Sequence, residues 1–162
     1  MPGNTGKNDP AIGIRAMTMG DLDAIVALEK AVFSDPWPRD AFSDILSGEG
    51  WSALVAECDT GIIAYACCMT LDEGARLANI AVAESYRRKS VAKRLLARIL
   101  DDAKKAECEY ILLEVRPGNT EAITFYERHG FRHMYRRPHY YHSPTEDALV
   151  MVRYLSEDDE NE

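Results

Sequence analysis

The sequence predicts an α/β fold of the α+β kind, in which a mixed, mostly antiparallel central sheet is flanked by helices. Short apolar runs typical of strands alternate with segments whose apolar residues repeat at helical spacing. The predicted order is a strand, two helices, three strands, a helix, a strand, a helix and two strands, and such a sheet needs helices on its faces. The 162 residues, 46 % hydrophobic and 28 % charged, suit one globular domain.

The first half of the chain is expected to form an edge strand, two helices and a hairpin. The elements expected there are a strand over 12–15, helices over 22–33 and 38–46, and strands over 52–58 and 62–70. Thr18 followed by Asp21 resembles a capping box at the start of the first helix. Pro38 suits a first helical turn, so the second helix is expected to begin there. The turn at 59–61 joins the two strands into a hairpin.

The second half is expected to add two helices and the remaining strands. These are a strand over 75–83, a helix over 91–103, a strand over 110–115, a helix over 119–129, and strands over 131–135 and 148–154. Asn119 is a good helix N-cap, and Gly130 suits the left-handed residue that ends a helix. The run 110–115 is almost wholly apolar, which is expected of a strand covered on both faces.

The ordered domain is expected to span residues 11–156. Residues 1–10 are polar and predict a flexible amino-terminal arm, and residues 157–162 predict a solvated acidic tail.

The charge balance limits the classes of partner that the protein is expected to bind. The 19 basic and 27 acidic side chains give a net charge of −8. A nucleic-acid partner is not expected, because phosphate binding needs a basic surface. The sequence has no run of 18 apolar residues and no apolar leader, so we expect no membrane partner and a cytoplasmic location.

Disulfide and metal chemistry are not expected. The cysteines at 58, 67, 68 and 108 lack zinc-type spacing, which favours buried reduced thiols. The histidines at 129, 133, 139 and 142 are close in sequence, but their spacing places them across a helix end, a strand and a loop.

Five cations gather where the helix over 91–103 begins: Arg87, Arg88, Lys89, Lys93 and Arg94. The positive end of the helix dipole repels cations, so this placement is unfavourable unless an anion offsets it. Free N–H groups at the helix start, flanked by lysine and arginine, form a phosphate site. A solvated basic turn is the alternative reading.

Two titratable residues in the second half are candidates for proton transfer. Glu114 lies near the end of an apolar strand, where partial desolvation is expected to raise its pKa toward that of a general base, although pairing with an arginine is the alternative. Tyr126 comes seven residues after Asn119 and so returns to the same helix face. Its hydroxyl can donate a proton to a leaving group, or the residue is simply a core aromatic.

Four stretches between Ile14 and Tyr154 resemble GNAT-superfamily acetyltransferases. They are Asn79-Ile80-Ala81-Val82 with Tyr86 to Ala92, Leu113-Glu114-Val115-Arg116 with Asn119, Ala122 to Phe131, and Arg137 with Tyr140-Tyr141, Asp147-Ala148 and Met151. The resemblance implies a GNAT-like acyl-CoA N-acyltransferase fold, and an enzyme that uses acetyl-CoA and no metal.

Within that superfamily the chain is most similar to the bacterial ribosomal-protein alanine N-acetyltransferases. The narrower signals are Leu-Glu-Val-Arg, the tyrosine pair and the early Pro36-Trp37. This resemblance implies acetyl transfer to a protein amino terminus, with the amino-terminal alanine of a small-subunit ribosomal protein as the substrate partner.

The resemblance also assigns roles to individual positions. Ile80, Ala81 and Val82 would present backbone groups to the acetyl-pantetheine arm. The pyrophosphate would be wrapped by Arg87, Arg88, Lys89, Ser90, Val91, Ala92 and Lys93, and Asn119 would also touch the cofactor. Ser90 stands where the family has glycine, whose missing Cβ lets the backbone approach phosphate closely.

The resemblance makes Glu114 the proton acceptor for the incoming ammonium, directly or through water. An acceptor is needed because only the neutral amine attacks a thioester, and an α-amino group has a pKa of roughly 7.7–8.0. Tyr126 would protonate the leaving thiolate. No cysteine sits in a base-paired motif, so direct attack in a ternary complex is expected.

On the acceptor side, Tyr140 and Tyr141 can supply rigid aromatic walls with hydroxyl groups. Trp37, after Pro36, could form the opposite wall. Glu29 could attract the ammonium group, although a solvated surface glutamate is an equal alternative.

Two other functions stay open on the sequence. One is a GNAT enzyme that acetylates a lysine side chain or a small-molecule amine, and the other is a non-catalytic acyl-CoA-binding domain. The negative charge suits a basic ribosomal partner through electrostatic steering, but it suits a polyamine equally well.

Overall fold

The structure is a computed structural model that describes residues 11–141 and 145–155. Its strands are β1 (Gly13–Ala16), β2 (Trp51–Cys58), β3 (Gly61–Leu71), β4 (Gly74–Val82), β5 (Tyr110–Val115), β6 (Arg132–Tyr141) and β7 (Glu146–Tyr154). Its α-helices are α1 (Leu22–Val32), α2 (Arg39–Ser47), α3 (Val91–Lys105) and α4 (Thr120–Arg128), with 3-10 turns η2 (Met19–Asp21) and η3 (Glu84–Tyr86). Each predicted element is present in the predicted order. The predicted arm over 1–10 and tail over 157–162 lie outside the described residues.

The strands pair in the order β1-β2-β3-β4-β5-β7-β6 within one seven-stranded sheet. The pairs β1–β2, β5–β7 and β6–β7 are antiparallel, and β4–β5 is parallel. The predicted fold class, a mixed and mostly antiparallel sheet with helices, is therefore confirmed.

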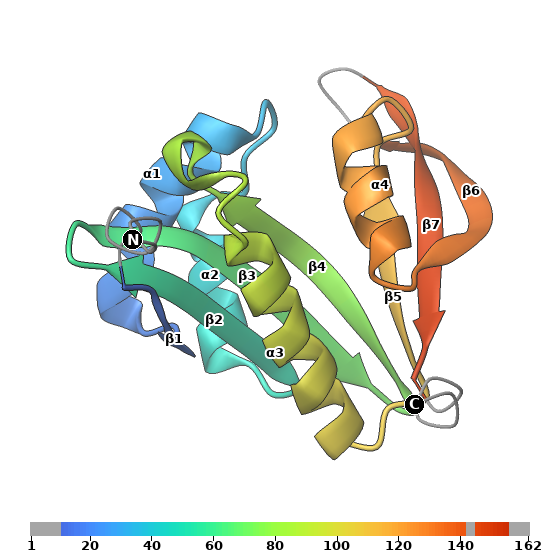
Figure 1. The fold of residues 1–162 in the computed structure, drawn as a ribbon, viewed down its shortest axis with the longest axis horizontal. Helices are drawn as coiled ribbons and strands as arrows, with labels where there is room; N and C mark the ends of the chain where they lie inside the picture. The colour runs from blue at the N-terminus through green and yellow to red at the C-terminus, as the bar shows by residue number, and fades with distance from the viewer. Residues whose placement is uncertain (1–10, 142–144, 156–162) are drawn as a thin grey trace, which may run out of the picture. The chain divides into compact units, whose positions relative to one another are not determined.

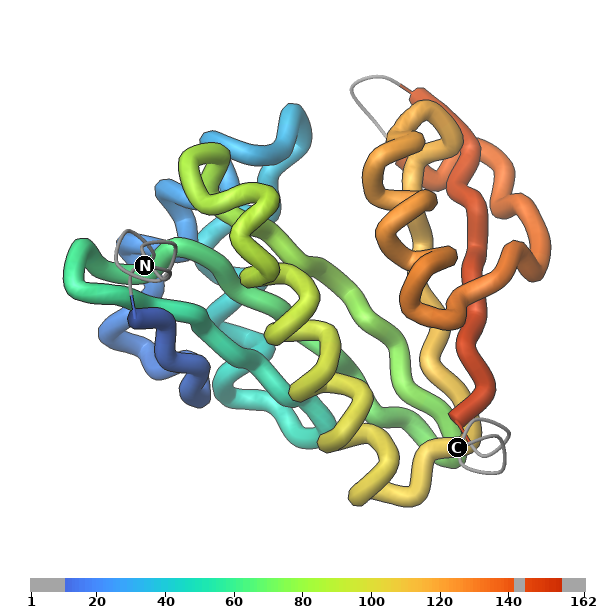
Figure 2. The backbone as a smooth tube through the Cα atoms, viewed as in Figure 1, coloured from blue at the N-terminus to red at the C-terminus, as the bar shows by residue number. Residues whose placement is uncertain are grey.

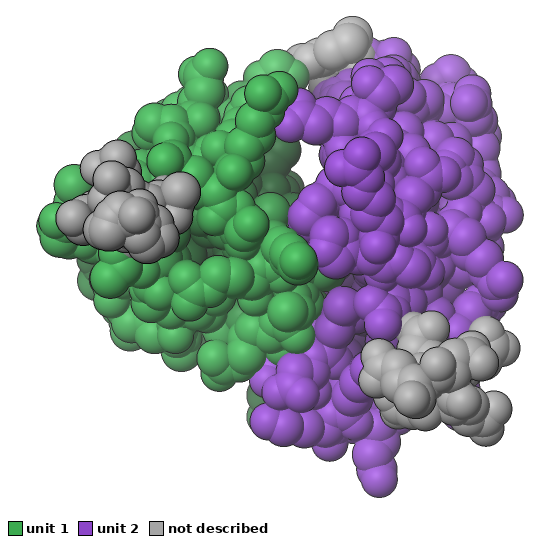
Figure 3. Space-filling view, viewed as in Figure 1, with its two compact units in different colours: residues 1–67, 79–99 green, residues 68–78, 100–162 purple. Residues whose placement is uncertain are grey.

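The chain divides into two compact units, which Figure 3 colours separately. One unit comprises residues up to Cys67 together with Asn79–Ile99, and the other comprises Cys68–Ala78 together with residues from Leu100 onward. The domain predicted over 11–156 thus contains two centres of packing, and each is described by itself below.

The first unit places helices on both faces of its strands. In Figure 1, α3 crosses in front of the strands of this unit and α2 lies behind them. Helices α1 and α2 pack their apolar faces on β2, β3 and β4, in a core that includes Leu22, Ile25, Leu28, Phe42, Ile45, Val55, Tyr65 and Ala81. On α3, Val91, Leu95 and Leu96 are buried. Helical spacing of apolar residues thus predicted which faces pack.

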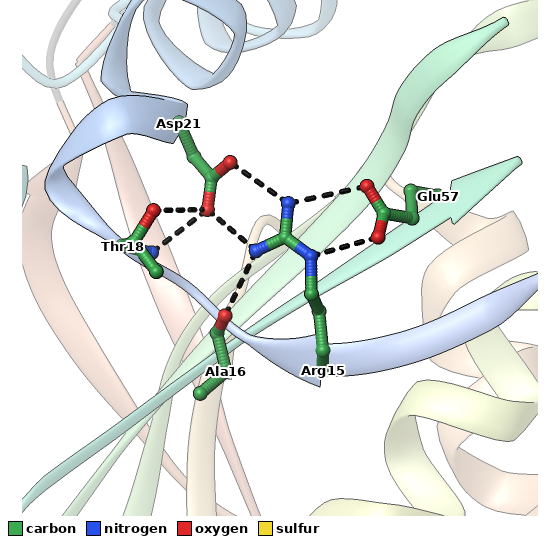
Figure 4. A network of polar contacts seen from close by, with 5 residues as sticks. All are labelled: Arg15, Ala16, Thr18, Asp21 and Glu57. Carbon is green, nitrogen blue, oxygen red and sulfur yellow. Dashed lines mark hydrogen bonds and ion pairs between the residues drawn. The ribbon is translucent and has the colours of Figure 1, made fainter. Parts of the chain in front are cut away.

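A charged network fixes the start of this unit (Figure 4). The guanidinium of Arg15 donates to both carboxylate oxygens of Asp21, at 2.8 and 2.9 Å, and to both of Glu57, at 2.8 and 3.1 Å. The Thr18 N–H donates to Asp21 at 2.7 Å, so the predicted capping box is present. Hydrogen bonds from Arg15 hold the pKa of Asp21 and that of Glu57 below their usual values. The network ties β1 to β2 and to the turn before α1.

In the second unit, β5 alternates between two environments. Ile111, Leu113 and Val115 are buried, whereas Tyr110, Leu112 and Glu114 are half-buried. The expectation of a strand covered on both faces was therefore wrong. Only one face of β5 packs into the core, and the other face, which carries Glu114, is half-buried.

Local signals around α4 are confirmed. The Asn119 side chain accepts a hydrogen bond from the Ala122 N–H at 3.1 Å, so Asn119 is the N-cap. Gly130 has φ of +88°, the left-handed conformation in which a glycine ends a helix at little cost. Strand β6 is the main departure, because it continues to Tyr141 rather than ending at 135.

The four cysteines form no disulfide, and three of them are buried while Cys58 is half-buried. Within the described residues, no helix has the length and apolar character needed to cross a membrane. No group of three or more histidine, cysteine or carboxylate side chains is placed to hold a metal ion in residues 11–141 and 145–155. His142 lies outside those ranges.

Candidate functional site

The predicted phosphate site is a loop that leaves β4, passes through η3 and enters α3 (Figure 2). Arg88 and Ser90 both adopt left-handed backbone conformations, with φ of 66° and 64°. The first helical hydrogen bond runs from the Arg94 N–H to the Ser90 carbonyl at 3.1 Å. The N–H groups of the residues between them begin the helix and have no earlier carbonyl of the helix to bind. These groups and the surrounding cations fit a diphosphate.

The side chains of this loop and of the adjacent part of β4 differ in exposure. The exposed residues are Arg87, Arg88, Lys89, Ser90 and Lys93. Val91 is buried and fixes the helix start in the core, while Ala92 is half-buried. On β4, Ala81 is buried and Ile80 and Val82 are half-buried.

Replacing Ser90 by glycine is expected to stabilise the protein by about 0.5–1 kcal/mol, because a residue with a Cβ is strained in the left-handed region. The Ser90→Gly variant is also expected to bind acetyl-CoA at least as tightly, since the backbone can approach phosphate more closely. Urea unfolding and calorimetric titration measure the two effects. Ser43→Gly, the same change inside the right-handed helix α2, is the matched control and should lose stability. A loss in both variants would contradict the strain at Ser90.

Glu29 is buried, with 1 % of its surface exposed. Its carboxylate accepts hydrogen bonds from the Trp37 N–H at 2.8 Å, from the Tyr65 hydroxyl, and from the Asn79 side-chain amide at 3.1 and 3.3 Å. Burial raises the pKa of Glu29, and these donors oppose that rise. The alternative of a solvated surface glutamate is therefore wrong.

The Glu29 network joins Trp37, a predicted acceptor wall, to β4, which is predicted to hold the cofactor. Trp37, whose ring packs on Phe42 with centroids 5.5 Å apart, lies in the segment that follows α1. Asn79 opens the Asn-Ile-Ala-Val run on β4 and also donates to the Tyr65 hydroxyl at 2.7 Å. One buried carboxylate thus fixes the α1–α2 connection against β3 and β4.

Replacing Tyr65 by phenylalanine is expected to destabilise the protein by about 1–3 kcal/mol, because it leaves a buried carboxylate short of a donor. Tyr65 is fully buried, so water cannot restore that bond. The free energy of unfolding in urea measures the loss. Tyr154→Phe removes a phenol hydroxyl outside the network and is the control. Equal stabilities of the two variants would contradict the role given to the network.

Glu114 lies on the half-buried face of β5, with 7 % of its side chain exposed. The Arg76 Nε donates to its two carboxylate oxygens at 3.2 and 3.0 Å. Arg137 places Nη1 3.6 Å from Oε1. The alternative interpretation, a glutamate paired with an arginine, therefore describes the contacts of Glu114.

Tyr126 is buried, and 7 % of its surface is exposed. Its ring packs edge-on against Phe125 and Phe131, with centroids 5.3 and 5.6 Å apart. Burial raises the pKa of the phenol well above its usual value. The hydroxyl therefore keeps its proton at neutral pH and can donate it. The ring is also part of the core, which was the alternative interpretation of Tyr126.

Tyr140 and Tyr141 are half-buried neighbours of Glu114. Their rings lie edge to face with centroids 4.9 Å apart, and Arg116 stacks 4.3 Å from the Tyr141 centroid. Burial raises the pKa of Tyr141, and the nearby charges of Tyr140 and Glu114 raise it further. The charge of Tyr126 also raises the pKa of Tyr141. The second unit therefore brings the predicted proton acceptor and the two predicted acceptor walls into one neighbourhood.

The predicted site residues fall into two groups, one in each unit. The first unit holds the phosphate loop, Ile80 to Val82, Glu29 and Trp37, and the second holds Glu114, Asn119, Tyr126, Tyr140 and Tyr141. Arg76 was missed. Its signal is the one charged residue in the run Gly-Ala-Arg-Leu-Ala-Asn-Ile-Ala-Val of β4.

Comparison with known proteins places the chain in a family. Residues 22–131 match the Acetyltransferase (GNAT) family. The chain is 31 % identical over 147 residues to the [ribosomal protein bS18]-alanine N-acetyltransferase of Escherichia coli, covering 88 % of this chain and 97 % of that protein. It is 30 % identical over 145 residues to the enzyme of the same name from Haemophilus ducreyi, covering 88 % and 99 %.

The fold gives the same assignment. The crystal structure of the ribosomal-protein-S18-alanine N-acetyltransferase from Escherichia coli superposes with a TM-score of 0.83 at 28 % identity, covering 90 % of this chain and 94 % of that one. With the family match and these relatives, this shows that the chain belongs to the GNAT acetyltransferase family and is an N-acetyltransferase that uses acetyl-CoA.

Proposed function

We propose that the protein transfers the acetyl group of acetyl-CoA to the amino-terminal alanine of a small-subunit ribosomal protein in the cytoplasm. The observation that carries this substrate is the 31 % identity, over 88 % of the chain, to an enzyme named for the alanine of ribosomal protein bS18. A second relative with the same name, at 30 % identity, supports it. The net charge of −8 favours encounter with a basic ribosomal protein.

In this proposal the two units supply different parts of the reaction. The N–H groups at the start of α3 and the cations Arg87, Arg88, Lys89 and Lys93 hold the diphosphate, and Asn119 contacts the cofactor. Acetyl-CoA, when bound, supplies an activated thioester. The backbone of Ile80, Ala81 and Val82 orients the acetyl-pantetheine arm of the cofactor by hydrogen bonds.

Proton transfer is assigned to two residues of the second unit. Glu114 takes the proton from the acceptor ammonium, directly or through water, because the neutral amine is the nucleophile. The protonated hydroxyl of Tyr126 donates to the sulfur as the C–S bond breaks. Tyr140, Tyr141 and Trp37 are assigned to the first residue of the acceptor, and Glu29, which accepts a hydrogen bond from the Trp37 N–H, acts on that residue through Trp37.

A panel of synthetic peptides tests the substrate. One set begins with alanine and has its lysines blocked, and a second set has a blocked amino terminus and a free lysine. Mass spectrometry after incubation with acetyl-CoA is expected to find the acetyl group on the alanine amine. Labelling on lysine alone, or on a polyamine in place of any peptide, would overturn the proposed substrate. Binding of acetyl-CoA with no transfer to any amine would point to a non-catalytic acyl-CoA-binding domain.

A further inference from the structure

The pairing of β4 with β5 brings an arginine beside the proposed base. The two strands are parallel, with Arg76 opposite Leu112. Glu114 comes two residues after Leu112 and so lies on the same face of β5. Arg76 and Glu114 are both half-buried on that face, and the long arginine side chain spans the offset between them.

Arg76 makes contacts with two residues of the proposed site at once. Its Nε donates to the Glu114 carboxylate at 3.0 and 3.2 Å, and its Nη2 donates to the Tyr140 hydroxyl at 2.5 Å. Arg137 lies over the Tyr140 ring at 5.2 Å and completes the group. The guanidinium is a rigid plane, so fixing its orientation on the carboxylate also fixes where it meets the phenol.

The contact with Tyr140 determines what that hydroxyl can offer an acceptor. A phenol has one proton, and its oxygen accepts from Arg76 here. The proton of Tyr140 therefore points away from Arg76 and is available as a donor, which suits the carbonyl oxygen of a peptide.

We propose that Arg76 is a positioning residue, which orients the Glu114 carboxylate toward the acceptor amine and sets Tyr140 as a hydrogen-bond donor to the acceptor backbone. The inference rests on the proposed function, in which Glu114 is the base. In this role Arg76 acts through its contacts with Glu114 and Tyr140. Replacing Arg76 should therefore lower kcat only while Glu114 is present, and raise the peptide KM only while Tyr140 is present.

Steady-state kinetics with an alanine-starting peptide test this inference through double-mutant cycles. Arg76→Met is expected to lower kcat about tenfold and to raise the peptide KM by a similar factor, the size expected of coupling between residues in contact. In a Glu114→Gln background, Arg76→Met should lower kcat no further. In a Tyr140→Phe background, it should raise the peptide KM no further.

Arg76→Lys separates the two functions of the arginine. A single ammonium keeps a cation for Glu114 but cannot hold both groups in one plane. We therefore expect kcat to recover in part and the peptide KM to stay high. Lys105→Met removes an ion pair with Asp101 in the same unit and is the matched control, with unchanged kinetics. The acetyl-CoA affinity of Arg76→Met should match that of this control.

The outcomes separate failure of this inference from failure of the proposed function. If Glu114→Gln turns over peptide as fast as the unmodified protein, the assigned base is wrong and the role of Arg76 falls with it. If Glu114→Gln is slow and adding Arg76→Met lowers its kcat by the same factor as in the unmodified protein, Glu114 remains the base and the positioning role of Arg76 is overturned. Unchanged kcat and KM in Arg76→Met would also overturn it.

Discussion

Replacing Glu114 by glutamine is expected to lower kcat by about a hundredfold or more, the range that a positioned general base contributes. Glutamine keeps the shape of the side chain but cannot take a proton from the acceptor ammonium. Steady-state rates with an alanine-starting peptide measure the loss, and calorimetric titration should show that acetyl-CoA still binds, because the phosphate loop lies in the other unit. Unchanged turnover would remove Glu114 from the mechanism.

The pH dependence makes the Glu114 experiment more specific. The α-amino group has a pKa of roughly 7.7–8.0, so the neutral fraction of the amine rises across this range without help. The defect of Glu114→Gln should therefore be largest near neutral pH and shrink as pH rises. Glu146→Gln is the matched control, because Glu146 is also paired with an arginine, Arg116 at 3.0 Å, in the same unit. A pH-independent defect in Glu114→Gln would indicate lost packing rather than a lost base.

Features set by neighbours in sequence could be predicted from the chain alone. The capping box of Thr18 with Asp21, the N-cap at Asn119 and the left-handed Gly130 each depend on residues within a few positions. The apolar faces of α1, α2 and α3 follow from helical spacing in the same way. The order of elements then limited the fold to a sheet covered by helices.

Features set by long-range contacts could not be predicted. The burial of Glu29 depends on Tyr65 and Asn79, which are 36 and 50 residues away along the chain. The contact of Arg76 with Glu114 depends on a register between strands 38 residues apart. No spacing rule reveals such partners, because these contacts follow from the order and register of the strands.

The length of β6 escaped prediction for a different reason. Residues 132–139 are all exposed, so the strand has no buried face and no alternation of apolar residues. The strand forms because it pairs with β7, and the pattern of apolar residues does not reveal that pairing. This extension carries Arg137 and Tyr140 to the neighbourhood of Glu114.

Replacing Tyr126 by phenylalanine is expected to lower kcat by about ten- to a hundredfold while acetyl-CoA affinity changes less, because the change removes a proton donor and leaves the ring. The ring packs against Phe125 and Phe131, and a phenylalanine ring keeps both contacts, so the variant should keep the fold. Kinetics compared with calorimetric titration separate the chemical step from cofactor binding. Tyr110→Phe, in the same unit, is the control.

The pH profile of the unmodified protein tests the same assignment from the other direction. Burial raises the pKa of the Tyr126 phenol above its usual value of about 10. The proton is therefore lost only at pH values above that range, and kcat should not fall between pH 7 and 9 through loss of the acid. If Tyr126→Phe weakens acetyl-CoA binding in proportion to its loss of rate, the hydroxyl acts on cofactor affinity and the leaving thiolate takes its proton from another source.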